Sequence, residues 1–503
     1  MPRLVPTLTA AEAAARIPDG ATIALSGSGG GVLEPDELIK ALAERFAKEG
    51  HPRDLTVMHA LGIGDGEGSG LARLAREGML ACLIGGHWSW SPELQGMAAA
   101  EEFAAYTLPA GAIMHLYREI GAGRPGLVTP IGLGTFADPA NGGGRVNAKA
   151  KADIVEKIKL DGKDYLRYLP RPIDVSLLRA TWADPHGNLS CEREAADIDN
   201  YVCALAARNS GGMAFAQVAE RRDAPVRPAR LARVPGVLLE GVVIAPGQKQ
   251  TCEHDYDPAV SGEAPPPDAP PSLEVPAGVR GLIARRAARE LAPGMSVNFG
   301  FGMPDGVPAA AAELGIDLGW TSVEQGWHNA EMLGGRVFGA GRHAQAQVSS
   351  PDQFDYYSGG GPDIAFLGMG EMDAAGNVNV SWLGKHVVGP GGFVEITQRA
   401  RKVVFCGTFE AKGFRAGAGP DGRLAIEAYG EVPKVVEKVR HITFSGERAR
   451  RDGQQVVYVT ERAVFSLQPD GVRLEEVAPG ADPRRDVLDR MGFAPALAPG
   501  LGL

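Results

Sequence analysis

The chain lacks most of the features that mark secreted, membrane or zinc-binding proteins. Its 503 residues include only five cysteines, which are scattered and form no CxxC pair. We therefore expect reduced thiols, with neither a disulfide framework nor a zinc site. No apolar run reaches the roughly 18 residues of a membrane helix, and the N-terminus has no apolar stretch of signal-peptide type. These absences predict a cytoplasmic protein with no membrane partner.

Positive charge and common catalytic motifs are also scarce. The formal net charge is −10, which argues against a nucleic-acid partner. The ten histidines show no metal-ligand spacing, and the chain has no GxSxG, HExxH or P-loop motif. We expect no metal site, and a nucleophile other than the usual serine or cysteine.

The length predicts two or more domains, because 503 residues exceed one ordinary hydrophobic core. Near the middle, a segment from 262 to 271 contains five prolines and is too proline-rich for a helix or strand. We predict an N-terminal domain at 1–263, an extended linker at 264–271 and a C-terminal domain at 272–503.

The two sides of this linker look like copies of each other. A strand-like run begins at Asp174 in the first half and at Asp363 in the second, and each has a second aspartate ten positions later. A Gly-Asn pair follows in both halves, at 187–188 and 376–377. Another strand-like run is centred forty-one positions after each first aspartate, at Phe215 and Val404, and a Val-Pro-led apolar stretch follows at Val234 and Val432. The matching spacings predict a duplication, and two unrelated α/β segments are the alternative.

The alternation of apolar runs and amphipathic segments predicts the fold class. Segments such as 35–50 and 280–294 have helical periodicity and lie between strand-like runs, which favours mostly parallel sheets covered by helices. The C-terminal segment 454–480 has short β-rich runs separated by turn residues. We predict two similar open α/β domains with an antiparallel C-terminal appendage.

Several glycine-rich loops follow apolar runs, where ligands bind in open α/β sheets. They lie at 27–31, 62–70, 300–306, 359–361 and 389–392. Each alone is expected to be a structural turn, but together they favour anion or oxyanion stabilisation over dinucleotide binding.

Glu324 is the candidate nucleophile that remains. The run WTSVEQG at 320–326 has strand character, and the carboxylate comes just after it and before Gly326. A glutamate in this position can project into a cleft, although composition alone favours a solvated loop residue.

The ordered set of motifs resembles the family I CoA-transferases, in the fused acetate/propionate/3-oxoacid branch. The resemblance covers almost the whole chain. The motifs that carry it are SGSGGGVLEPDEL at 26–38, GGHW at 85–88, IGLGTFADP at 131–139, DYDPAVSGE at 255–263, NFGFGMPDGV at 298–307, TSVEQG at 321–326, QFDYYSGGGPDIAFLGMGEMDAAGNVNVS at 353–381, GPGGFVEITQRARKVVFCGTF at 389–409 and YVTERAVF at 458–465.

The resemblance implies ping-pong CoA transfer through Glu324, by way of an acyl-glutamyl anhydride and a glutamyl-CoA thioester. Coenzyme A is then a substrate beside the acyl-CoA and the carboxylic acid, and no cofactor is bound permanently. A homodimer or homotetramer is expected. The residues implied in oxyanion stabilisation or CoA binding are Gly29, Gly30, Gly31, Asn298, Gly300, Gly302, Gly391 and Gly392.

Two departures from the family pattern fall at the expected acyl pocket. Trp327 and His328 follow the glutamate where the family has small residues, and Ala110 replaces the glutamine of a Leu-Pro-Gln-Gly stretch. They predict an acyl group larger or more functionalised than acetate or propionate. The alternatives are core packing for Trp327 and a surface or hydrogen-bonded loop position for His328.

Other activities are possible on this scaffold. In an acyl-CoA thioester hydrolase, water would replace the second acid. Carrier-dependent relatives in citrate- or malonate-cleaving complexes are disfavoured by the fused chain, and a sugar-phosphate isomerase would leave Glu324 without a purpose. The retained glutamate and glycine loops favour CoA transfer.

Overall fold

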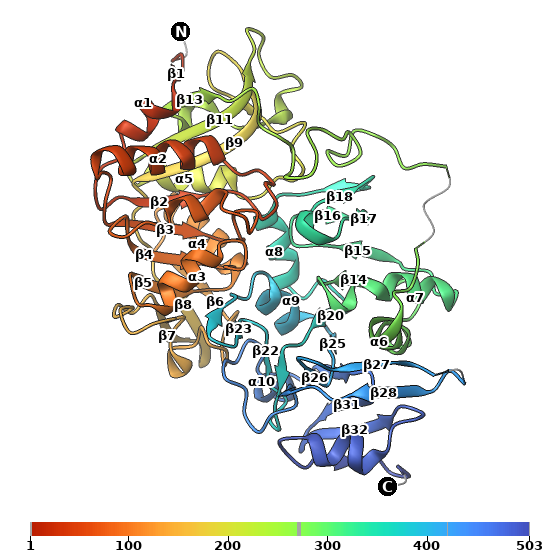
Figure 1. Ribbon diagram of the computed structural model, residues 1–503. Coiled ribbons are helices and arrows are strands. Elements are labelled where there is room, and N and C mark those ends of the chain that lie inside the picture. The colour runs from red at the N-terminus through yellow and green to blue at the C-terminus, as the bar shows by residue number, and fades with distance from the viewer. Residues whose placement is uncertain (1–2, 269–272, 420, 502–503) are drawn as a thin grey trace.

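The first half of the chain forms a parallel sheet in the computed structural model, which describes residues 3–268, 273–419 and 421–501 (Figure 1). The strand order is β1-β13-β11-β9-β2-β3-β4-β5, and every pair along this path is parallel. Two short antiparallel strands, β10 and β12, attach beside β9. The strands of this sheet are β1 (Thr7–Leu8), β2 (Thr22–Leu25), β3 (Leu55–His59), β4 (Leu80–Gly85), β5 (Ala104–Thr107), β9 (Val175–Ala183), β10 (Leu189–Ser190), β11 (Met213–Arg221), β12 (Ala232–Val234) and β13 (Gly241–Ile244).

The second half forms a mixed sheet in the order β19-β16-β15-β14-β20-β25-β30-β31-β32-β33. Its central strands, from β15 to β30, are parallel, whereas β16, β19, β31 and β32 pair antiparallel with their neighbours. The predicted C-terminal antiparallel strands therefore extend the main sheet. Its strands are β14 (Ser296–Phe299), β15 (Trp320–Ser322), β16 (Trp327–His328), β19 (Ala346–Gln347), β20 (Ile364–Gly368), β25 (Lys402–Cys406), β30 (Gln455–Val459), β31 (Ala463–Gln468), β32 (Gly471–Val477) and β33 (Ala496–Leu497).

Short strands outside the two sheets form small hairpins and one three-stranded ribbon. They are β6 (Leu127–Thr129), β7 (Val155–Leu160), β8 (Lys163–Tyr168), β17 (Glu331–Met332), β18 (Gly341–Arg342), β21 (Glu371–Met372), β22 (Val378–Asn379), β23 (Trp382–Leu383), β24 (His386–Val387), β26 (Glu410–Ala411), β27 (Arg415–Ala418), β28 (Leu424–Ala428) and β29 (Val432–Pro433).

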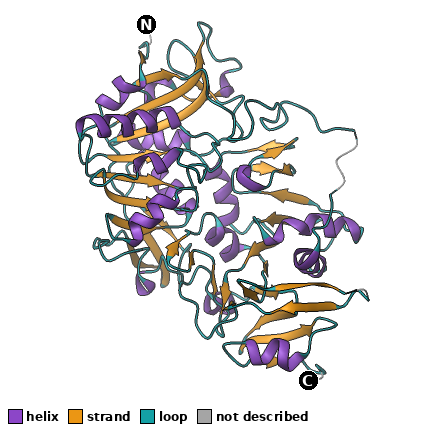
Figure 2. Ribbon diagram, viewed as in Figure 1, coloured by secondary structure: helices purple, strands orange, loops and turns teal. Residues whose placement is uncertain are grey.

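Helices flank both sheets, and some of them lie between the halves (Figure 2). They are α1 (Ala10–Ala15), α2 (Asp36–Glu49), α3 (Pro92–Ala99), α4 (Ala110–Gly121), α5 (Asn200–Asn209), α6 (Gly278–Ala288), α7 (Val307–Glu313), α8 (Ser350–Ser358), α9 (Phe393–Arg399) and α10 (Gly446–Arg451). In the first half α4 packs on α5 and also on α8 of the second half. Buried side chains from both halves form one continuous core there, including Ile113 and Tyr117 from α4 and Phe354 and Tyr357 from α8.

The predicted duplication is confirmed by strand order and by paired hydrogen bonds. The order β13-β11-β9-β2-β3 in the first half matches β30-β25-β20-β14-β15 in the second. At the start of β9, the carboxylate of Asp174 accepts a hydrogen bond from the backbone N–H of Thr22, at 2.8 Å. Before β20, Asp363 accepts from the N–H of Ser296 at 2.9 Å. Both aspartates thus tie the same pair of strands together.

The second aspartate of each half closes the same kind of turn. Asp184 accepts hydrogen bonds from the backbone and side chain of Asn188, and Asp373 accepts the same bonds from Asn377. The glycine before each asparagine has φ of +81°, a left-handed conformation that favours glycine.

The predicted equivalence of the two Val-Pro stretches is wrong. Asn188 accepts a hydrogen bond from the N–H of Gly236, just after Val234-Pro235, but its counterpart Asn377 accepts from the N–H of Gly446. The structural match of Val234 is therefore Phe444, and both lie across an antiparallel bridge from equivalent strands. Val432 instead pairs with Ala411 in a hairpin that the first half lacks at this position. Shared composition misled the sequence comparison there.

The described part of the proline-rich segment, residues 262–268, runs along the outside of the molecule (Figure 1). Its residues 264–268 form no helix or strand, and Pro266 and Pro267 line a cavity of the second half. The rest of the predicted linker, 269–271, lies outside the described residues. The exact domain boundaries stay a prediction.

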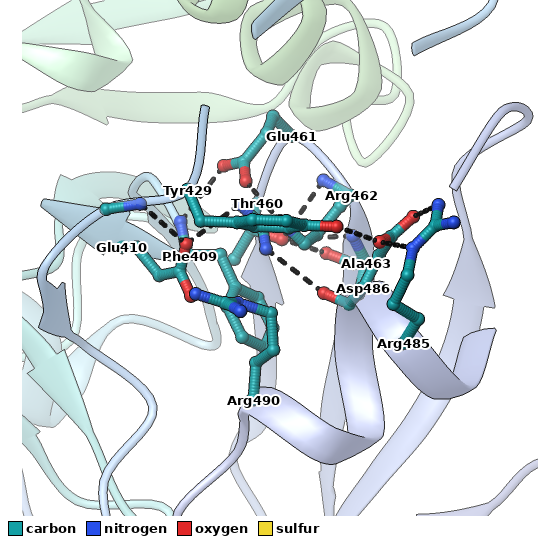
Figure 3. Close-up of polar contacts among 11 residues, drawn as sticks. Phe409, Glu410, Tyr429, Thr460, Glu461, Arg462, Ala463, Arg485, Asp486 and Arg490 are labelled. Atoms are coloured by element: carbon teal, nitrogen blue, oxygen red, sulfur yellow. Dashed lines mark hydrogen bonds and ion pairs between the residues drawn. The ribbon is translucent and has the colours of Figure 1, made fainter. Parts of the chain in front are cut away.

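A buried arginine anchors the C-terminal strands and the segment that follows them (Figure 3). Arg462 lies in the turn between β30 and β31 and has no exposed surface. Its guanidinium donates to Glu461 at 2.7 Å, contacts Glu410 at 3.5 Å and donates to the carbonyl of Asp486 at 3.1 Å. Arg490 also binds Glu410. The YVTERAVF motif therefore has a structural role, because its Glu-Arg pair joins three separate segments.

Candidate active site

Glu324 lies two residues beyond the end of β15, at the carboxyl edge of the second sheet, as predicted. The turn that carries it is closed by hydrogen bonds from the N–H of Val323 to the carbonyl of Trp327, at 3.1 Å, and from the N–H of Gly326 to the carbonyl of Val323, at 3.0 Å. Gly326 has φ of +94°, and a Cβ there would lie 2.0 Å from the carbonyl oxygen of Val348. Only glycine fits at this position, and the turn therefore fixes the backbone position of Glu324.

A buried polar network supports the strand end below Glu324. The side-chain amide of Asn298, on β14, donates to the carbonyl of Ser322 at 3.0 Å and to the hydroxyl of Tyr357 at 3.1 Å. That hydroxyl donates to the Ser322 Oγ at 3.1 Å. Asn298 is completely buried, and its Oδ1 has no partner among the described residues. Asn298 therefore holds the end of the strand before Glu324 in place.

The carboxyl group of Glu324 is in an uncharged environment. Burial raises its pKa above the ordinary value, opposed by its own backbone and by the side-chain amide of Gln325 at 3.5 Å. No arginine or lysine is among the groups that shift the pKa. A carboxylate desolvated in this way, without a paired cation, is more reactive as a nucleophile.

The glycine loop before α9 lies against Glu324 and joins the two halves. A Cβ on Gly392 would lie 3.4 Å from the Glu324 Cβ and 2.9 Å from the Phe354 ring. The N–H of Gly391 donates to the carbonyl of Gly86 at 2.8 Å, and its carbonyl accepts from the N–H of Ala110 at 3.0 Å. Ala110, predicted at the acyl pocket, is thus beside the loop that contacts the nucleophile.

The other glycine loop, Gly29–Gly31, contacts both halves. A Cβ on Gly30 would lie 2.1 Å from the carbonyl oxygen of Arg336 in the second half, and one on Gly29 would lie 2.2 Å from Trp90 Nε1. Gly30 and Gly31 have φ of +76° and +78°. The contacts leave no room for side chains, so close backbone approach explains these glycines.

Two residues that sequence reasoning missed, Trp90 and His87, lie between the two glycine loops. A Cβ on Gly62 would lie 2.2 Å from Trp90 Cδ1 and 2.9 Å from His87 Nδ1, and one on Gly391 would lie 3.8 Å from His87 Cδ2. The only sequence signal was a histidine and two tryptophans directly after a strand. The predicted loop at 359–361, by contrast, precedes β20 and is at the opposite edge of the sheet.

Not every predicted backbone donor is free. The N–H groups of Gly30, Gly300 and Gly391 donate to the carbonyls of Gly64, Phe366 and Gly86. Among the described residues, the N–H groups of Gly29, Gly302 and Gly392 have no such acceptor.

An apolar cavity of about 490 Å³ opens beside the strand ends of β14 and β15 and reaches Ser322 and Val323. Trp327 lines it and is 2% exposed, and its Nε1 has no partner within the described chain. The other large side chains that line it include Phe299, Phe301, Leu333 and Phe338. Gly300 also contributes to this wall.

His328 lies on the opposite face of β16 from Trp327, because neighbouring strand residues point to opposite sides. Its Nδ1 accepts a hydrogen bond from Trp320 Nε1 at 2.7 Å, and its ring packs edge-on against Tyr356. The two residues therefore line different spaces. An acyl-pocket role for either one stays a prediction.

A cleft of about 880 Å³ is in the first half at the carboxyl ends of β2, β11 and β13. It reaches Gly31 but includes no residue of the Glu324 turn, so we do not assign it to the chemistry. Its lining combines acidic side chains such as Glu34 and Asp65 with Arg179 and Arg336.

All five cysteines are free thiols in the structure. Among residues 3–268, 273–419 and 421–501, no cluster of three histidine, cysteine or acidic side chains could hold a metal ion. Within the same ranges, no helix has the length and apolar character needed to span a membrane.

Comparison with known proteins identifies the family. Residues 7–245 match the profile of the coenzyme A transferase family. The acetate CoA-transferase YdiF of Escherichia coli O157:H7 is 38% identical over 506 residues, covering 99% of this chain and 94% of that protein. The caffeate CoA-transferase of Acetobacterium woodii is 38% identical over 501 residues, covering 98% and 95%.

Solved structures agree over the whole chain. The crystal structure of the YdiF apoenzyme from E. coli O157:H7 matches with a TM-score of 0.92 at 37% identity, covering 99% of this chain and 94% of that one. The same protein in a thioester complex with CoA also matches with a TM-score of 0.92, at 36% identity and with the same coverage. This chain therefore belongs to the family I coenzyme A transferases and is a CoA-transferase enzyme.

Proposed function

We propose that this enzyme moves CoA from an acyl-CoA to a carboxylic acid through covalent intermediates on Glu324. The carboxylate oxygen attacks the thioester carbonyl, the C–S bond breaks, and an acyl-glutamyl anhydride forms with release of CoA thiolate. The thiolate then attacks the glutamyl carbonyl and expels the first carboxylate, which leaves a glutamyl-CoA thioester. A second carboxylic acid repeats these steps in reverse and leaves as acyl-CoA.

One observation carries this proposal: a partly buried glutamate stands at a strand end, without a cation, against a glycine loop from the junction of the halves. Desolvation supports attack by the carboxylate, and the closely packed junction supports exclusion of water from the anhydride. The names of the full-length relatives support CoA transfer over thioester hydrolysis.

The free backbone donors narrow the proposed oxyanion site. Gly392 is the strongest candidate, because its N–H has no acceptor in the described chain and its Cα is next to Glu324. Gly29 is the candidate from the first half. We propose that Gly30, Gly31, Gly300 and Gly391 instead allow close backbone approach.

The apolar cavity next to Val323 is the proposed path of the pantetheine arm of CoA. It reaches the nucleophile's strand from the second half, and Gly300, Gly302 and Asn298 belong to the loop and strand beside it. Trp327 Nε1 offers an unused donor there, which suits an amide carbonyl of the arm. This location favours contact of Trp327 with CoA over contact with the acyl group.

We further propose an acyl group larger than acetate, because Ala110 has only a methyl group where the family has a glutamine. The two relatives, named for acetate and caffeate, are equally similar and leave both sizes open. The working form that we propose is a cytoplasmic homodimer or homotetramer, with CoA as a substrate and no permanently bound cofactor.

The test is an adduct measurement. We expect acyl-CoA without acceptor to add CoA to the peptide that contains Glu324, seen by intact and peptide mass, and to leave Glu324→Ala unmodified. Adding acetate or caffeate should then discharge the adduct into a new acyl-CoA. Glu313→Ala, an exposed glutamate paired with Arg285, is the matched control and should still form the adduct. An unmodified wild-type Glu324 peptide during turnover would contradict the mechanism, and discharge to water alone would identify a hydrolase.

A further inference from the structure

The GGHW motif holds His87 at the junction between the halves. The carbonyl of Gly86 accepts from the N–H of Gly391, and the N–H of Trp88 donates to the carbonyl of Val388, both at 2.8 Å. These two bonds fix the backbone on either side of His87 to the loop that contacts Glu324. The histidine is therefore positioned by the same loop as the nucleophile.

The imidazole of His87 is available to a ligand. It is partly buried, and among the described residues its ring nitrogens make no hydrogen bond. Its Nδ1 edge lies over Gly62 and its Cδ2 edge lies toward Gly391, where glycines leave room. Trp90 lies against the same side of Gly62 as His87, because one Cβ built on Gly62 would meet both rings.

The charge of this side of the site is neutral. Burial, with a smaller contribution from His59, lowers the pKa of His87 to about 4, so the ring is uncharged near neutral pH. No cation shifts the pKa of Glu324 either. A neutral imidazole offers one hydrogen-bond donor and one acceptor, whereas a buried second carboxylate would need a cation.

We propose that His87 faces the acyl group of the Glu324 anhydride and selects monocarboxylic acyl groups that carry an uncharged hydroxyl or keto substituent. Trp90 supplies the apolar wall beside it. The inference rests on the proposed function, because it assumes that the acyl group is carried on Glu324. It assigns the acyl group to the side of the first half and leaves the cavity at Trp327 to CoA.

The experiment compares three donors: 3-hydroxybutyryl-CoA, butyryl-CoA, which lacks only the hydroxyl, and succinyl-CoA, which adds a carboxylate. We expect wild-type kcat/KM to be highest for the hydroxyacyl donor and lowest for succinyl-CoA. His87→Leu should lower the hydroxyacyl-to-butyryl ratio by about tenfold or more, the value of one lost hydrogen bond. His87→Asn, which keeps a donor and an acceptor, should retain part of the ratio.

His51→Leu is the matched control, because His51 is exposed and binds Asp19 at the far surface, and its donor ratio should equal that of the wild type. An unchanged ratio in His87→Leu, or succinyl-CoA used as well as the hydroxyacyl donor, would overturn the inference. The Glu324 adduct is measured with every donor. If no donor forms it in the wild type, the proposed function fails; if the adduct forms and the ratios do not respond, only the role of His87 fails.

Discussion

The two halves share their strand order but differ at the position that carries Glu324, the proposed nucleophile. β3 pairs with β2 as β15 pairs with β14, and Val57 opposite Ile23 corresponds to Thr321 opposite Val297. Counting three residues onward, the first half has Ala60 where the second has Glu324. The aspartates that bind backbone are present in both copies, whereas the carboxylate proposed to react is present in one.

The difference indicates how the duplication divides the work. The first half has no carboxylate at this strand end, but it contributes His87 and Ala110 to contacts with the Gly391–Gly392 loop that lies against Glu324. The cleft of the first half and the cavity of the second half differ as well. Charged side chains line the cleft, whereas the lining of the cavity is largely apolar. In the proposed mechanism one copy thus provides the nucleophile, and the other provides side chains that face it.

The largest effect is expected from making the two copies alike at this position. Glu324→Ala should lower CoA transfer by about 10⁴-fold or more, because the covalent route is lost. Adding Ala60→Glu should not restore activity, since the first half has no counterpart of the Asn298–Tyr357 support: Ala24 is in the place of Asn298. Steady-state transfer assays measure both variants, with Glu313→Ala as the control. Recovery in the double variant would show that the halves are interchangeable.

Much of the fold followed from local pattern. Apolar runs and turn residues predicted the parallel strands, and the spacing of Asp184 and Asp373 predicted equivalent turns, because an aspartate that binds its own turn acts within a few residues. The position of Glu324 was also predictable from local pattern, because a strand-like run comes directly before it. Because neighbouring residues of a strand point to opposite faces, the sequence could also have predicted that Trp327 and His328 line different spaces.

What could not be predicted depends on tertiary contacts. Asn188 and Asn377 each accept a hydrogen bond from a backbone N–H far along the sequence. No local pattern marks these partners, so the equivalence predicted for the Val-Pro stretches of the two halves is wrong. His87 is brought to the site by backbone bonds across three hundred residues of sequence, for which no local pattern exists. Which glycine N–H groups are free likewise depends on strands that pack only in the folded chain.

A second difference between the halves is the buried arginine where the second sheet extends. The register aligns Arg462 with Pro246, just past the end of β13, where the chain leaves the first sheet. Arg462→Met should lower the free energy of unfolding by about 3–5 kcal/mol, because Glu461 would remain buried without its cation and Glu410 would keep only Arg490.

Urea unfolding combined with hydrogen exchange measures this effect and locates it. Protection should fall in β30 to β32 and stay unchanged in β2 to β4. Arg484→Met, an exposed arginine in the same C-terminal segment, is the control and should change stability little. Equal loss of protection in both halves would contradict a local anchor.

The shared turns provide the opposite test, since the same change should have the same effect in both copies. Asp184→Ala and Asp373→Ala each remove a buried carboxylate and leave partly buried N–H donors of one turn without an acceptor, and each should cost about 3 kcal/mol. Thermal and denaturant unfolding measure the two values, with the exposed Asp255→Ala as the control. A large cost in one half and none in the other would show that the turns are not energetically equivalent.

The smallest effect concerns the contact that joins the halves. Glu395, on α9, is 1% exposed and accepts a hydrogen bond from the N–H of Ala112 at the start of α4, at 2.9 Å. Equivalent residues of the two halves, such as Asp174 and Asp363, are 189 positions apart in the sequence. The same offset makes Ala206 the first-half counterpart of Glu395. The carboxyl group that binds across the junction is thus also present in one copy only.

Burial raises the pKa of Glu395 from 4.5 to about 7. Between these values the folded protein keeps a proton that the unfolded chain releases, so the stability contributed by this group falls as pH rises. From about pH 5 to pH 7 the loss should be roughly 2 kcal/mol. Glu395→Gln, which resembles the protonated form, should remove that part of the slope.

Urea midpoints measured across this range for both proteins give the difference, and Glu427→Gln, at an exposed site, should keep the wild-type slope. Glu34 and Asp199 also have raised pKa values and titrate in every variant, so only the difference in slope between the two proteins reports on Glu395. Parallel curves of urea midpoint against pH for wild type and Glu395→Gln would mean that this carboxyl group does not couple the junction to pH.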